Sequence, residues 1–99
     1  MFRPVPARTR LGAERIGAYL TAWRKLQGLT TAQVAERAGI SRGTLRKLEH
    51  GETTVGLDVL LNVTRVLGAL DRVVASFDPY ETDLGRARAD EALPKRVRT

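Results

Sequence analysis

The sequence predicts an all-α fold, a compact domain of five short helices, from three observations. Ninety-nine residues are enough for about one small domain with a modest core. Apolar residues recur three and four positions apart along most of the chain, which is the spacing of a helix with one buried face. Glycines, which commonly end helices, follow four of these periodic segments: Gly28, Gly39, Gly51 and Gly68. We therefore expect a helical domain at 12–77, a flexible basic N-terminal arm at 1–11 and a weakly structured C-terminal extension at 78–99.

The N-terminal part combines that arm with one longer helix. Residues 1–10, "MFRPVPARTR", contain two prolines and three arginines without periodicity, which favours a flexible arm. From about Gly12 to Gln27 a single apolar face follows, made of Ile16, Tyr19, Leu20, Trp23 and Leu26. We expect this face to lie toward a core, with Trp23 as a core or interface anchor rather than a stacking platform.

Two short helices come next, and their connection is too tight for an antiparallel pair. The segment "TTAQ" has the pattern of a capping box begun by Thr30, and Gly39 ends that helix. After only Ile40, Ser41 is placed to cap a second short helix that ends at Gly51. Helices joined by about three residues that include a glycine must cross steeply, which is the helix-turn-helix arrangement.

The rest of the chain predicts two more helices and a less regular end. The segment "LDVLLNVTRVLG" indicates a helix with Leu57, Leu60, Leu61, Thr64 and Leu67 on its buried side. A fifth helix is expected at 70–76, although the β-branched residues of "VVASF" would also suit a strand. From Asp78 onward the apolar content falls, so "TDLGRARADEAL" is compatible with a marginal helix and "PKRVRT" is a basic tail.

The positive charge is concentrated in the N-terminal half. The formal net charge of +6 is the sum of +7 for residues 1–51, −4 for 52–94 and +3 for 95–99. Such a half suits a polyanion, and composition alone does not choose among DNA, RNA and an acidic membrane surface. A membrane surface is disfavoured because the basic residues do not line one long helix with a broad apolar face. We expect no membrane span and no secretory signal, since the apolar runs are short and broken by charge.

A helical wheel separates the two faces of the helix that begins at Ser41. At 100° per residue, Leu45 and Leu48 define the inward direction. Gly43, Lys47 and His50 then lie opposite, flanked by Arg42 and Arg46. The major groove of B-DNA admits one α-helix, and arginine or lysine on its outer face reaches guanine acceptors or phosphates. The plain alternative is a solvated basic surface, with Gly43 merely tolerated near the helix start.

These motifs together resemble those of the Cro and phage-repressor type of helix-turn-helix, the XRE family. The resemblance covers roughly residues 16–74 and rests on Leu29, Thr30, Val34, Ala35, Gly39, Ile40, Ser41, Leu45, Leu48, Glu49 and Gly51. It implies a five-helix, repressor-like DNA-binding domain that acts as a homodimer on double-stranded DNA with an inverted repeat. The family's base-reading positions correspond to Ser41, Arg42, Gly43 and Lys47. Thr44, Arg46, Arg24 and Thr31 are then the candidate phosphate contacts, with Thr31 standing where the family commonly has glutamine and Arg24 equally suited to plain solvation.

Two functional hypotheses follow. The first is a sequence-specific transcriptional regulator, most simply a repressor, in the cytoplasm and associated with the nucleoid. The second is an antitoxin, because the downstream pattern resembles small regulators of this family that pair with kinase-like or ribonuclease toxins. Acidic residues of the extension would then meet a basic toxin surface, or simply be solvated: Asp78, Glu81, Asp83, Asp90 and Glu91.

No constellation for catalysis is evident. His50 is the only histidine, the chain has no cysteine, and no metal-ligand spacing, phosphate loop or nucleophile elbow occurs. We therefore expect no enzyme activity, no catalytic residue, no metal and no cofactor.

Overall fold

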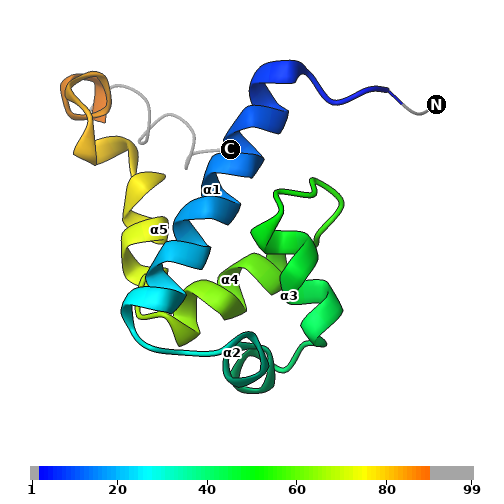
Figure 1. The fold of residues 1–99 in the computed structure, drawn as a ribbon. Coiled ribbons are helices and arrows are strands. Elements are labelled where there is room, and N and C mark those ends of the chain that lie inside the picture. Colours follow the sequence, from blue (N-terminus) through cyan, green and yellow to red (C-terminus); the bar gives the residue numbers. More distant parts are fainter. Residues whose placement is uncertain (1–2, 90–99) are drawn as a thin grey trace.

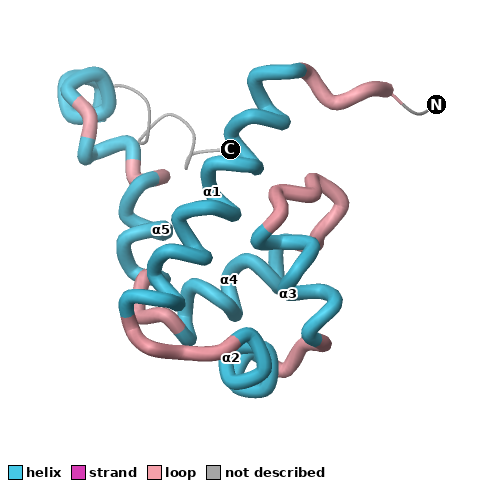
Figure 2. The backbone as a smooth tube through the Cα atoms, in the orientation of Figure 1, coloured by secondary structure: helices cyan, strands magenta, loops and turns pink. Residues whose placement is uncertain are grey.

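The computed structural model describes residues 3–89, and all of their regular secondary structure is helical (Figures 1 and 2). The α-helices are α1 (Ala7–Leu26), α2 (Thr31–Ala38), α3 (Arg42–Glu49), α4 (Leu57–Val66) and α5 (Leu70–Ser76). A 3₁₀ helix, η1 (Pro79–Glu81), follows, and residues 83–89 are again helical. The predicted all-α class is confirmed over this part of the chain. The five predicted α-helices are therefore followed by further helical structure.

The segment that also suited a strand is helical, so that alternative is wrong. Residues 70–76 form α5, which packs against α4, and the guanidinium of Arg72 lies 4.6 Å from the centre of the Trp23 ring on α1. Tertiary packing of this kind overrides the strand preference of neighbouring valines. In the extension, residues 79–81 and 83–89 are helical, the latter within the segment for which a marginal helix was considered. Residues 90–99, with Asp90 and Glu91, lie outside the described residues.

The first helix begins at Ala7 rather than near Gly12, so residues 7–11 of the expected flexible arm are helical. Pro6 is the residue just before the first turn, with φ −57° and ψ 147°. Proline costs nothing there because the first amides of a helix have no intrahelical partner. The alanine, arginine and leucine residues that follow favour a helix, which explains why the segment does not stay extended.

The core lies where α1 to α4 meet. Its buried apolar residues are Leu20 of α1, Val34, Ala35 and Ala38 of α2, Leu45 and Leu48 of α3, and Val63 and Leu67 of α4. The predicted inward faces of α2 and α3 are therefore confirmed. The predictions for α1 and α4 are wrong in part, because Tyr19 is 64 % exposed, Leu26 81 % and Leu57 69 %. The neighbouring helices cover only part of the apolar face of α1 and part of the apolar face of α4.

A close contact between α1 and the end of α3 depends on glycine. A Cβ on Gly17 would lie 2.6 Å from the carbonyl oxygen of Leu48, closer than packed side chains allow. Gly51 combines φ +79° with backbone atoms of Glu14 that leave no room for a Cβ. These two positions let the backbones of α1 and the α3 terminus touch, and the contact sets the position of α3.

Within residues 3–89 no helix is both long enough and apolar enough to cross a membrane.

Candidate nucleic-acid interface

The sequence between α2 and α3 produces a compact turn. Gly39 adopts the left-handed conformation with φ +70°, and its amide donates to the carbonyl of Glu36. The amide of Ile40 donates to the carbonyl of Ala35, so the end of α2 is closed by the next two residues. The chain is then free to begin α3 at once, and α3 crosses α2 steeply (Figure 1). Helix α2 packs against α3 and α4, and α3 packs against α2 and α1.

Helix α3 is anchored by one face only. Leu45 is fully buried and Leu48 is 7 % exposed, and both belong to the core cluster. The opposite side carries Arg42, Gly43, Arg46 and Lys47, together with His50 just beyond the helix end, and all five residues are exposed. The arrangement predicted by the helical wheel is therefore confirmed as geometry.

The cations of this outer face are not neutralised by the rest of the described structure. Arg42, Arg46 and Lys47 form no ion pair with a carboxylate of residues 3–89. Their charges consequently face solvent on a helix whose other side is rigidly packed. Long cationic side chains in this position suit the guanine acceptors of the major groove and the phosphates beside it.

The start of α3 is held by a pair of hydroxyls. The Ser41 hydroxyl accepts a hydrogen bond from the Thr44 amide at 3.0 Å and donates its own proton to the Thr44 hydroxyl oxygen at 2.9 Å. Within the described part of the chain the Thr44 hydroxyl donates to no acceptor, so its proton can be donated to a phosphate oxygen. Ser41 is thus chiefly a cap, and Thr44 has the better geometry for a phosphate contact.

Gly43 has no role that the fold explains. It lies in the first turn of α3, and a Cβ built there would meet only the Ser41 hydroxyl, at 3.8 Å. Any small side chain would fit, unlike at Gly17. Folding of the domain therefore does not require glycine at position 43. The glycine either serves contact with a binding partner such as DNA or is simply tolerated.

The N-terminus of α2 offers a second polar edge. The capping box predicted from "TTAQ" is present, since the Thr30 hydroxyl accepts from the Gln33 amide and the Gln33 side chain accepts from the Thr30 amide. Thr31 is the first residue of the helix and is half-buried. First-turn amides have no intrahelical acceptor, so the amide and hydroxyl of Thr31 suit an anionic oxygen.

Arg24 does not belong to this surface, and its assignment as a phosphate contact is corrected. Its Nε donates to Glu49 at 2.8 Å and its Nη2 donates to the same carboxylate at 3.2 Å, while Nη1 donates to the carbonyl of Leu29 at 3.1 Å. The side chains of the pair are only 11 % and 10 % exposed. All three nitrogens of the guanidinium donate hydrogen bonds within the protein. Arg24 therefore holds the last turn of α3 through Glu49, on the side away from the basic outer face.

A polar depression beside the end of α3 was not anticipated from the sequence. It is lined by Arg10, Glu14, His50, Gly51, Glu52, Thr53 and Thr54. Arg10 lines this depression because α1 begins as early as Ala7. The prolines of the N-terminal segment had instead favoured a flexible arm there. The two glutamates offset the arginine, so this depression is a poorer anion site than the outer face of α3. The feature of the sequence that could have indicated this depression is the pair of hydroxyl residues in "GETT", Thr53 and Thr54.

The packed α2–turn–α3 unit and the basic outer face of α3 define a DNA-binding domain of the helix-turn-helix class. A family model described as "Helix-turn-helix domain" matches residues 15–77. This span contains α2 to α5 and more than half of the chain, so the chain belongs to the helix-turn-helix domain family. The comparisons with curated proteins and with solved structures found no match.

Proposed function

We propose that this protein is a sequence-specific transcriptional regulator that acts as a dimeric repressor on an inverted-repeat operator. The observation that carries the proposal is the basic outer face of α3, where Arg42, Arg46 and Lys47 form no ion pair with residues 3–89 and lie opposite a buried inner face. A helix held so firmly from one side presents its other side at a constant angle. That constancy is what base recognition in a groove requires.

Each residue of the face has a distinct role in this proposal. Arg42 and Lys47 contact base edges, and the Gly43 backbone approaches the bases closely. Ser41 lies at the same edge but uses its hydroxyl to cap α3. Phosphate contacts come from three residues on the flanks: Thr31, Thr44 and Arg46. They hold the helix in register without distinguishing sequences.

Repression follows from occupancy, because a protein bound across an operator excludes RNA polymerase from the same DNA. Two copies related by a two-fold axis would place their α3 helices in half-sites about one helical turn apart. The protein would work in the cytoplasm, associated with the nucleoid, without a cofactor and without enzyme activity. The narrower XRE assignment belongs to this proposal as well.

Selection of bound sites from random DNA tests the proposal. Enrichment of an inverted repeat by the wild-type protein supports both specific recognition and two-fold binding. A protein carrying Arg42→Ala and Lys47→Ala is the control, since it should keep its fold and lose the enrichment. If the wild-type protein enriches no sequence at moderate salt, the proposal is wrong.

A second candidate function, an antitoxin, is favoured by the surface of the extension. Tyr80 is 38 % exposed and Leu84 is 65 % exposed, and neither packs on the core cluster. Apolar side chains beyond the DNA-binding domain suit a protein partner. Glu81 is exposed and would suit a basic one, whereas Asp83 is paired with Arg86 at 2.8 Å. Removing residues 78–99 separates the two functions. A protein that acts only as a DNA-binding regulator should keep operator binding after the deletion. If the chain is an antitoxin, a toxin that co-purifies with the full chain should no longer co-purify with the shortened one.

A further inference from the structure

An apolar groove lies on the side of the domain formed by α1 and α5. It has a volume of about 380 Å³, and its apolar wall is formed by Ile16, Tyr19, Trp23, Leu60, Val73 and Phe77. We call this surface the α1/α5 groove. In Figure 1, α5 lies on one side of α1 and α3 on the other, so the groove and the basic face of α3 do not compete for the same surface.

The rim of the α1/α5 groove is more exposed than apolar side chains usually are. Phe77, just beyond the end of α5, is 82 % exposed, Tyr19 64 % and Ile16 45 %. Val74, in the last turn of α5 but outside the groove lining, is 61 % exposed. Scattered apolar residues on a surface need no explanation, whereas a contiguous group of this kind marks an interaction site.

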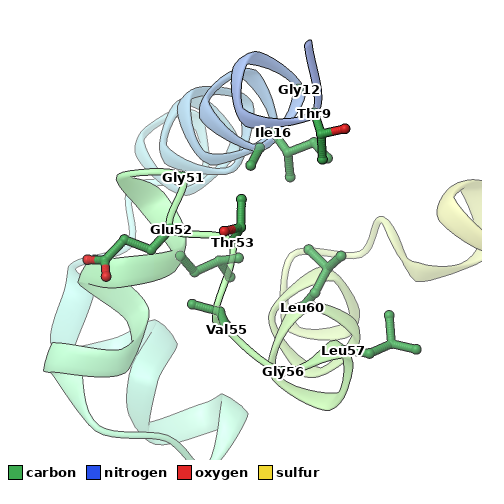
Figure 3. Close-up of a pocket in the computed structure, with 12 residues that line it drawn as sticks. Thr9, Gly12, Ile16, Gly51, Glu52, Thr53, Val55, Gly56, Leu57 and Leu60 are labelled. Carbon is green, nitrogen blue, oxygen red and sulfur yellow. The ribbon is translucent and has the colours of Figure 1, made fainter. Parts of the chain in front are cut away.

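The apolar surface continues beyond the groove along α1. Ile16 and Leu60 also line a second depression, of about 410 Å³, with Val55 and Leu57 (Figure 3). In Figure 3 the side chains of Ile16 and Leu60 point into the space between α1 and α4, while Leu57 points away from the loop. Since Leu57 is 69 % exposed, the patch extends from the end of α5 to the start of α4.

The charge of this surface favours a second copy of the chain over a partner recognised by charge. The whole chain carries +6, so most faces of two copies repel each other. Among residues 3–89, Arg72 is the only charged residue that lines the α1/α5 groove, and its guanidinium lies 4.6 Å from the centre of the Trp23 ring of the same chain. Two copies would therefore meet here with little like-charge repulsion, whereas an acidic or basic partner would find no matching charge.

The shape and size of the surface also suit a two-fold contact. An interface of this symmetry needs one patch that carries both a projecting group and a recess, and Phe77 projects beside the groove that it helps to line. Fully exposed aromatic side chains offer about 150–250 Å² each, so the exposed parts of the rim amount to roughly 500 Å² per copy. Two copies would bury on the order of 1,000 Å², the lower end for a specific interface.

We propose that the α1/α5 groove is the homodimer interface, in which Phe77 of each copy enters the groove of the other. The inference rests on the proposed dimeric repressor, for which it names the surface that brings two copies together while both α3 helices stay free.

Sedimentation equilibrium of the full chain tests the interface with a matched pair of variants. Phe77→Asp should raise the dimer dissociation constant by ~100-fold or more, since the substitution removes a buried aromatic twice per dimer. Leu26→Asp is the control, because Leu26 is 81 % exposed, lies on α1 and does not line the groove. It should leave the constant within a factor of about three. Circular dichroism establishes that both variants are folded.

Cross-linking provides a second measurement that does not depend on a disruptive substitution. The chain has no cysteine, so single cysteines are unique. A mixture of Ser76→Cys and Tyr19→Cys chains, both of which keep Phe77, should give covalent heterodimers with a short bismaleimide, whereas Leu26→Cys mixed with Tyr19→Cys should not. Absence of the first product, or equal yields from both mixtures, overturns the interface.

The remaining outcomes also decide the matter. If the wild-type chain stays monomeric at high micromolar concentration and on selected DNA, or if Phe77→Asp dimerises as well as wild type, the groove is not the homodimer interface and another occupant covers it. Failure of the proposed function is a separate result, namely a wild-type protein that enriches no DNA sequence whatever its association state.

Discussion

Arg24 of α1 and Glu49 of α3 form a two-pronged ion pair, with Nε donating to Oε2 at 2.8 Å and Nη2 donating to Oε1 at 3.2 Å. The remaining nitrogen of the guanidinium donates to the carbonyl of Leu29 in the loop before α2. One side chain therefore connects α1, the start of the helix-turn-helix and the last turn of α3. The pair faces away from the basic surface of α3 and fixes the orientation of that helix.

Arg24→Ala should lower the free energy of unfolding by about 2–4 kcal/mol, because it leaves the Glu49 carboxylate nearly buried without its partner. Replacing both residues, Arg24→Met with Glu49→Leu, should cost less than the single change. Urea denaturation measures both values, and Lys25→Ala, at an exposed neighbouring position, should change stability by less than about 0.5 kcal/mol. A stable Arg24→Ala protein with weaker, less salt-sensitive DNA binding would restore Arg24 as a phosphate contact.

Gly17→Ala should destabilise the protein by about 1–3 kcal/mol, since the added methyl group meets the carbonyl oxygen of Leu48 and forces α1 away from α3. Gly12→Ala, in the same helix with open space around it, should instead be neutral or stabilising. Thermal unfolding of the two variants side by side makes the comparison. Equal melting temperatures would show that α1 and α3 are not packed as tightly as this contact requires.

Gly43→Ala should stabilise the protein by up to about 1 kcal/mol, because alanine favours helix and nothing in the domain obstructs its methyl group. If the α3 backbone approaches the bases, the same change weakens binding to a selected operator. Chemical denaturation and a binding titration on one preparation separate the two effects, with Gly12→Ala as the control for stabilisation alone. Stronger stability with unaltered affinity would mean that Gly43 is simply tolerated.

Arg42→Ala should cost ~1–3 kcal/mol of binding free energy on the selected site and relax the preference at one base position. Arg46→Ala should instead weaken binding to selected and random DNA alike and reduce the slope of log affinity against log salt by about one. Titrations at several salt concentrations on both DNAs provide the comparison. An equal loss on both DNAs for Arg42→Ala would place Arg42 at a phosphate rather than a base.

Local signals were sufficient for the helix-turn-helix. The capping box at Thr30, the left-handed Gly39 and the cap at Ser41 each act within a few residues, so their sequence patterns determine their geometry. The two leucines of α3 likewise predicted which face of the helix is buried, and hence which face carries the arginines and the lysine. At the N-terminus the prolines led to a wrong prediction of a flexible arm through residue 11. A proline is as compatible with the position just before a helix, where Pro6 lies, as with an irregular segment.

The sequence by itself therefore determined the helices, their caps and the basic face of α3, since these depend on neighbours in the chain. Only the tertiary structure decided which charges are free and which apolar residues are covered. Arg24 and Arg42 are both arginines on helices, yet one is joined to Glu49 across 25 residues and the other faces solvent. Tyr19 and Leu20 are adjacent members of one apolar stretch, yet only Leu20 is buried, because the helices that pack on α1 cover just part of its face.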